Sequence, residues 1–118
     1  MRALIIAVLL AACWGASASA QTVGGKYRVA GTNPDGSAYS GTALITPSSD
    51  STCRIEWQTG STSRGICMLA NKAFAAGYQL GKNVGLVVYE LQPDGSLKGV
   101  WTVADQPGAG TETLIPMR

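Results

Sequence analysis

The stretch CRIEWQTGSTSRGIC, residues 53–67, predicts a β-hairpin closed by a disulfide bond. Both halves alternate apolar and polar side chains with a period of two, which is typical of half-buried strands. A bend at Thr59-Gly60-Ser61 places Cys53 directly opposite Cys67. Directly opposed residues of an antiparallel pair have Cβ atoms about 4.5–5.5 Å apart, close to what a disulfide requires. The same register pairs Gln58 with Thr62, Trp57 with Ser63 and Ile55 with Gly65.

A repeated tetrapeptide, PDGS at residues 34–37 and 93–96, predicts two further hairpins. Proline presets the first turn position, aspartate fits the second, and glycine accepts the left-handed conformation of a three-residue loop with a glycine bulge. The resulting partners are Gly31–Tyr39, Val29–Gly41, Tyr27–Ala43, Leu91–Leu97, Tyr89–Gly99, Val87–Trp101 and Gly85–Val103. Both hairpins thus set large side chains opposite glycines, as a curved sheet requires.

The rest of the chain continues the strand pattern, with turn signals about every 8–12 residues and no helical period. We predict strands at residues 26–33, 37–46, 51–58, 62–70, 73–80, 84–92, 96–104 and 110–116. One face is apolar and the other polar, except for an external apolar stripe of Val84, Leu86 and Val88. The facing of the last strand stays open, because Glu112 and Leu114 alternate with Thr111, Thr113 and Ile115.

These strands predict an all-β fold, a single small antiparallel up-and-down meander barrel of about eight strands with one hairpin disulfide. Closure removes the exposed edges of the sheet. An eight-stranded barrel has an interior that is filled by side chains or holds one small ligand.

Residues 1–20, MRALIIAVLLAACWGASASA, predict a cleaved signal peptide. Arg2 is followed by an apolar run too short to span a bilayer, and Ala18-Ser19-Ala20 resembles a cleavage site. We therefore expect a flexible segment at 21–25, a barrel domain at 26–118, and export to the periplasm or beyond. In an alternative, Leu10-Ala11-Ala12-Cys13 is a lipoprotein signal and Cys13 carries a lipid anchor; we favour simple secretion.

The net charge and the number of cysteines limit which classes of function this chain is compatible with. The chain has nine Lys and Arg and seven Asp and Glu, so loss of Arg2 with the leader leaves a net charge of +1. That balance gives no electrostatic case for nucleic acid or an anionic membrane. Loss of Cys13 leaves an even pair of cysteines, which favours a disulfide in an exported chain.

The residue types do not favour catalysis. The sequence has no histidine, which excludes Ser-His-Asp and Cys-His pairings and histidine-ligated metals. The carboxylates are scattered and form no pair that would flank a glycosidic bond. Only Glu112 is a candidate to point inward, the alternative being an exposed or salt-bridged residue.

A calcium loop at Asn33, Asp35 and Ser37 fails, because its sixth and twelfth positions are Ala38 and Leu44 rather than glycine and glutamate. We expect no enzyme, no metal and no cofactor.

Aromatic side chains are the remaining candidates for a site. Trp57, Tyr78, Tyr89 and Trp101, with Tyr27 and Tyr39, share the predicted inner face. They would line a ligand cavity or, alternatively, form the core of a small domain.

Four stretches carry a resemblance to a known group of proteins: KYRVAGTNPDGSAYSGTALIT, CRIEWQTG, VYELQPDGSLKGVWT and GTETL. In these the chain resembles small secreted bacterial β proteins often labelled fibronectin-binding. Cys53 and Cys67 depart from that layout, and the label assigns no site residues. The resemblance implies an extracellular binding role. Together with the residue types, it leads us to expect a non-enzymatic exported binding module, a monomer, that contacts a protein or extracellular-matrix partner. The alternatives are a periplasmic inhibitor of a protease or lysozyme, and a carrier of a small apolar ligand.

Overall fold

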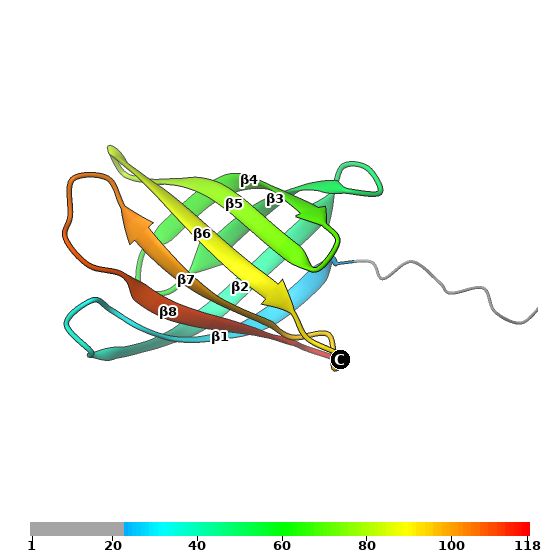
Figure 1. The fold of residues 1–118 in the computed structure, drawn as a ribbon, viewed down its shortest axis with the longest axis horizontal. Coiled ribbons are helices and arrows are strands. Elements are labelled where there is room, and N and C mark those ends of the chain that lie inside the picture. The colour runs from blue at the N-terminus through cyan, green and yellow to red at the C-terminus, as the bar shows by residue number, and fades with distance from the viewer. Residues whose placement is uncertain (1–22) are drawn as a thin grey trace, which may run out of the picture.

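The computed structural model describes residues 23–118, which form a closed antiparallel barrel of eight strands joined in chain order (Figure 1). The predicted signal peptide and the alternative anchor at Cys13 lie outside the described residues. Every predicted strand is found within one residue of its bounds. The strands are β1 (Gly25–Thr32), β2 (Ala38–Pro47), β3 (Thr52–Gln58), β4 (Thr62–Ala70), β5 (Ala73–Leu80), β6 (Asn83–Leu91), β7 (Leu97–Val103) and β8 (Gly110–Pro116).

All three hairpins have the predicted register. Cys53 lies opposite Cys67 with their Cα atoms 5.0 Å apart, and the two sulfurs are bonded. The barrel closes where β1 pairs with β8. The fold is therefore the predicted meander barrel with a single hairpin disulfide.

The first PDGS loop has the expected bend. Gly36 adopts a φ of +89°, and its N–H donates to the carbonyl of Asn33 at 2.8 Å. The Asp35 carboxylate accepts from the hydroxyl of Ser37 at 2.6 Å and from its N–H at 2.9 Å. These two bonds lower the pKa of Asp35. Residues 92–96 have the same hydrogen bonds. Asp35 and Asp94 therefore each accept hydrogen bonds from the serine of their own turn.

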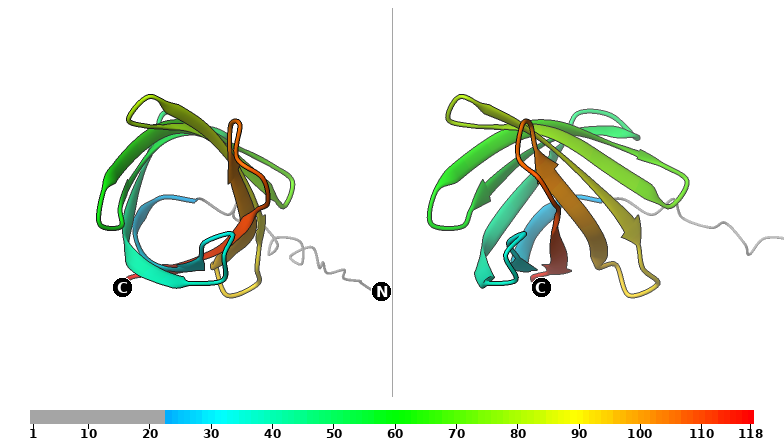
Figure 2. Two further views of the ribbon diagram at one scale, coloured as in Figure 1. Left: turned by 90° about the vertical axis from the view of Figure 1, so that its left-hand side faces the viewer. Right: turned by 60° about the vertical axis from the view of Figure 1, so that its left-hand side comes forward.

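The two ends of the barrel differ. The turns after β2, β4 and β6 mark one end, which is packed with apolar side chains such as Phe74 and Leu97, both fully buried. The turns after β1, β3, β5 and β7 mark the other end, which faces the viewer in the left panel of Figure 2. No connection between strands is longer than the six residues at 104–109. The barrel is thus filled at one end and rimmed by short turns at the other.

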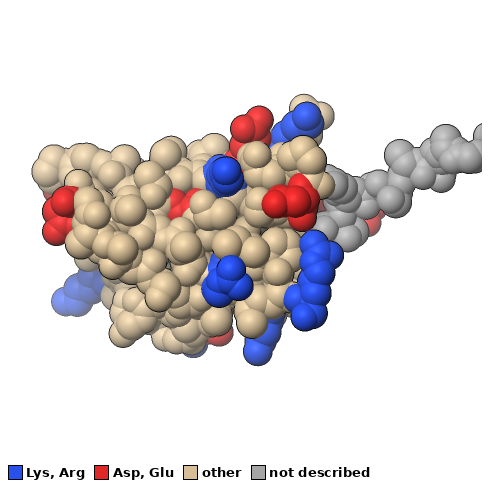
Figure 3. Space-filling view, turned by 90° about the horizontal axis from the view of Figure 1, so that it is seen from below, with Lys and Arg blue, Asp and Glu red and all other residues tan. Residues whose placement is uncertain are grey.

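The outer wall carries more apolar surface than expected. Val84, Leu86 and Val88 point outward as predicted; side chains of the neighbouring strand β7, and of β4 on the far side of β5, extend the stripe. The resulting outer apolar band comprises Ile66, Met68, Val84, Leu86, Val88 and Val100. On the face shown in Figure 3, basic and acidic side chains are interspersed on a mostly uncharged surface. Residues 23–118 contain no helix long and apolar enough to cross a membrane.

Candidate ligand-binding site

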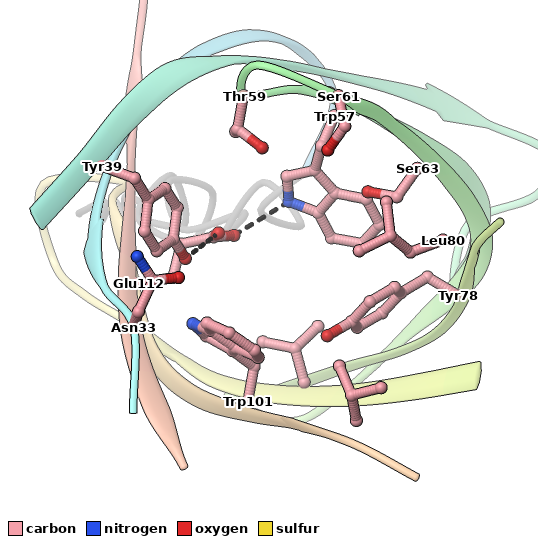
Figure 4. Close-up of a pocket in the computed structure, with 12 residues that line it drawn as sticks. Asn33, Tyr39, Trp57, Thr59, Ser61, Ser63, Tyr78, Leu80, Trp101 and Glu112 are labelled. Carbon is pink, nitrogen blue, oxygen red and sulfur yellow. Dashed lines mark hydrogen bonds between the residues drawn. The ribbon is translucent and has the colours of Figure 1, made fainter. Parts of the chain in front are cut away.

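The open end of the barrel contains a cavity of about 220 Å³. Figure 4 shows side chains from several strands pointing into it, with Thr59 and Ser61 of the turn after β3 at its edge. Its wall combines four aromatic rings, four small polar side chains, three aliphatic side chains and one carboxylate. These are Tyr39, Trp57, Tyr78 and Trp101; Asn33, Thr59, Ser61 and Ser63; Leu80, Val87 and Val103; and Glu112.

The aromatic rings lie in two pairs. The rings of Trp57 and Tyr78 have centroids 5.1 Å apart and are tilted by 60°. Those of Tyr39 and Trp101 are 6.1 Å apart with the edge of one toward the face of the other. Both geometries are favourable for aromatic side chains, so the pairs fix the shape of the cavity wall.

Glycines on neighbouring strands make room for three of these rings. A Cβ atom on Gly31 would lie closer than 3.0 Å to the ring of Tyr39, and one on Gly85 equally close to that of Tyr78. Trp101 lies across Gly110 in the same way. Because the glycines have no side chain, each ring folds against the adjoining strand. The centre of the open end is left free.

Glu112 on β8 is the centre of the polar contacts. It faces inward between Gly31 and Gly99 of the flanking strands and is 7% exposed. Its Oε1 accepts from the Tyr39 hydroxyl at 2.7 Å. Its Oε2 accepts from the indole Nε1–H of Trp57 at 2.8 Å and from the Tyr89 hydroxyl. Figure 4 shows the bonds to Tyr39 and Trp57. Donors from β2, β3 and β6 thus converge on one carboxylate from β8.

The tyrosines around Glu112 titrate at unusually high pH. Burial, and next the negative charge of Glu112, raise the pKa of Tyr39 and of Tyr89 far above the ordinary value. The same two causes raise the pKa of Tyr78 to about 12. All three hydroxyls therefore remain protonated donors at neutral pH.

Three of the four predicted ligand-lining residues contact the cavity: Trp57, Tyr78 and Trp101. Tyr89 does not line it. The Tyr89 ring is 1% exposed, packs against Phe74 with centroids 5.9 Å apart, and reaches the site only through its hydroxyl. Tyr27 also lies elsewhere, in the buried core.

Two parts of the site were not assigned from the sequence. The first is Glu112, which was a candidate to face inward but was given no role. The second is the group of small polar side chains, which are Asn33, Thr59 and Ser61 in the turns at the rim and the buried Ser63 on β4. The sequence could have predicted that these turns lie together, because the turns after alternate strands of an up-and-down barrel are at the same end.

The site offers a single acidic group. Among the residues that the structure describes, Glu112 is the one carboxylate in the cavity wall. Residues 23–118 contain no group of three His, Cys, Asp or Glu side chains placed to hold a metal ion. The arrangement can therefore accept a hydrogen bond or a positive charge, stack aromatic or aliphatic groups, and hydrogen-bond at its rim.

Comparison with known proteins shows the fold. No protein-family model and no curated protein matches the chain. A redesigned beta barrel shares 20% identity with a TM-score of 0.72, covering 81% of this chain and 92% of that one. The redesigned beta barrel mFAP1, bound to DFHBI, shares 22% with a TM-score of 0.72, covering 85% and 100%. A de novo designed fluorescence-activating beta barrel shares 17% with a TM-score of 0.64, covering 82% and 96%.

Proposed function

We propose that this chain is a non-enzymatic binding protein that holds one small amphipathic molecule in the open end of its barrel. The observation that carries the proposal is the cavity of about 220 Å³, in which aromatic rings surround a buried carboxylate. Ligand sites typically combine apolar walls with a few placed polar groups. Pockets for drug-sized molecules measure roughly 300–1,000 Å³, so the ligand is smaller than that class.

Two further observations support this function. An eight-stranded barrel can hold one small ligand in its interior, and of the structural neighbours mFAP1 is bound to DFHBI. The mixed wall leads us to propose an amphipathic ligand rather than a purely apolar one. The Cys53–Cys67 disulfide is compatible with an oxidising compartment, and we propose that the protein acts after export.

The test is a fragment screen that follows the two indole N–H resonances of the cavity wall by NMR. The indole of Trp57 donates to Glu112, and that of Trp101 donates to the carbonyl of Thr111 at 3.2 Å. A ligand in the cavity is expected to shift both resonances. A screen in which no compound shifts either one would refute the proposed function.

Gly85→Ala is expected to weaken binding of any cavity ligand at least about tenfold, a change of 1.4 kcal/mol. The new methyl group overlaps the ring of Tyr78, which is the movable partner and must turn toward the cavity. Affinities from the same NMR titration measure the effect.

Gly77→Ala is the matched control for this substitution. Gly77 lies on the outer wall, where a Cβ would meet only a methyl of Leu86 at 3.9 Å. Unchanged affinity is expected for this variant. If Gly85→Ala also retained full affinity, the ligand would bind outside the cavity.

A protein partner is the second candidate, favoured by the outer apolar band. Ile66 on β4 is 69% exposed and Leu86 on β6 is 62% exposed, and the two flank Gly77 of the intervening strand β5. Contiguous exposed apolar surface is typical of interaction sites, and the family resemblance implies a matrix protein such as fibronectin. The inhibitor alternative has no comparable support, because no long loop protrudes among residues 23–118.

Leu86→Lys is expected to weaken binding to immobilised fibronectin at least about tenfold, since it places a charge within the apolar contact. Surface plasmon resonance with the purified protein measures this. Ser40→Lys, an exposed position on β2 away from the band, is the charge-matched control. Absence of binding by the wild-type protein would remove fibronectin as the partner.

A further inference from the structure

Glu112 determines the chemical class of the cavity ligand. Its three hydrogen-bond donors are two hydroxyls and an indole, all of them neutral groups. None of the described Lys and Arg residues lines the cavity. Within residues 23–118 the one ion pair joins Arg64 to Glu56 at 2.6 Å on the outer surface. A carboxylate that is 7% exposed therefore lacks a basic partner, although buried charges are normally paired.

The carboxylate also retains hydrogen-bonding capacity. An ionised carboxylate has about four acceptor sites, two on each oxygen. Oε2 receives both Trp57 and Tyr89, whereas Oε1 receives Tyr39 alone. One acceptor site on Oε1 is therefore left for a donor that enters the cavity.

The rings around Glu112 favour the same kind of ligand. The face of an aromatic ring carries negative charge and attracts a cation within about 6 Å of its centroid, and aromatic cages bind substituted ammonium ions. Tyr39, Trp57, Tyr78 and Trp101 surround the opening in Figure 4. A positive group beside Oε1 would therefore contact both the carboxylate and aromatic surface.

A metal ion fits the site poorly. Calcium takes 6–8 oxygen ligands, and magnesium binds through one or two carboxylates together with waters and phosphates. The cavity supplies one carboxylate, and that group is already bonded to three side chains. The hydroxyls of Thr59 and Ser61 belong to the turn after β3 at the rim, where they suit the polar end of an organic molecule.

We propose that the cavity binds a small organic ammonium ion that carries at least one N–H group. Its nitrogen donates to Oε1 of Glu112, its alkyl groups lie against the four rings, and a polar end reaches the rim. This inference rests on the proposed ligand-binding function and names its ligand class.

The test compares molecules of the same shape and different charge. Protonated dimethylaminoethanol is the cation, 3-methylbutan-1-ol is its neutral isostere, and 3-methylbutanoate is an anion of similar size. A primary alkylammonium and its alcohol form a second matched pair. Calorimetry and the Trp57 indole resonance are expected to show at least about tenfold tighter binding of the cations, equal to 1.4 kcal/mol.

Two substitutions assign the effect to Glu112. Glu112→Gln keeps the shape and removes the charge, and it is expected to abolish the preference for cations. Glu90→Gln removes one exposed carboxylate from the outer wall of β6 and is expected to leave the preference unchanged. Trp101→Leu retains Glu112 and is expected to weaken cation binding by removing one ring. An NMR spectrum of each variant verifies that it is folded.

The possible results separate the two proposals. If neutral or anionic molecules bind the cavity as tightly as the cations, or if Glu112→Gln keeps the preference, the ammonium inference is overturned and the ligand-binding function stands. The same holds if no cation binds while neutral fragments shift the indole resonances. If no compound of either kind binds, both proposals fail.

Discussion

Glu112→Leu is expected to lower the free energy of unfolding by about 3 kcal/mol. The substitution leaves the indole N–H of Trp57 and the hydroxyl of Tyr89 without an acceptor, and these side chains are 4% and 1% exposed. Each buried unsatisfied donor costs about 1–3 kcal/mol. The leucine no longer buries a charge, which offsets part of that loss. Urea unfolding followed by circular dichroism measures the change.

Glu112→Gln and Glu90→Gln are the controls for this prediction. In Glu112→Gln the side-chain amide oxygen can still accept from Trp57 and Tyr89, so a loss of only about 1 kcal/mol is expected. Glu90→Gln is expected to stay within about 0.5 kcal/mol, because the side chain is exposed. A Glu112→Leu protein as stable as the wild type would mean that burying the carboxylate costs as much as its three bonds contribute.

Gly65→Ala is expected to lower the free energy of unfolding by about 3 kcal/mol. A Cβ on Gly65 would overlap the carbonyl oxygen of Gly77 and lie 2.8 Å from the Cα of Tyr78. Both are backbone atoms of β5, so the strain is relieved only by moving β5 away from β4. The melting temperature is expected to fall by roughly 12–24 °C, measured by thermal denaturation.

Gly77→Ala is again the matched control. Gly77 lies in β5, the strand that Gly65→Ala would displace. Its Cβ meets nothing closer than a Leu86 methyl at 3.9 Å. Alanine also restricts the unfolded chain, so the change should lie between zero and a gain of about 1 kcal/mol. Equal losses in the two variants would show that contact with the adjacent backbone is not the cause.

The fold could be predicted because its main determinants are local. Each PDGS turn sets the register of its hairpin by backbone conformation alone, and the opposed Cys53 and Cys67 set that of the third. The inward direction follows from alternation, as with Trp57 and Tyr89. Ile66 and Met68 alternate with the inward-facing Cys67, so the sequence of β4 is sufficient to predict that both are exposed.

The site depended on contacts between distant parts of the chain. Glu112 faces inward because β8 pairs with β1 and with β7, and the mixed alternation around residue 112 does not determine that facing. The sequence also left open whether side chains fill the barrel interior, because this depends on how the aromatic rings are oriented. Tyr78 lies across Gly85 rather than over the barrel axis, and residue types alone do not specify such a conformation. Three aromatic candidates were therefore placed in the cavity, and the carboxylate that organises them was not assigned.

The disulfide faces the interior, and this determines how a reductant can reach it. Cys53 and Cys67 are each 6% exposed and belong to paired positions of β3 and β4. A thiolate must approach a sulfur atom directly to exchange with the bond, and here the sheet stands in the way. Reduction in the folded state therefore waits for β3 and β4 to open, so the lifetime of the bond in a reducing solution reports how often this barrel opens.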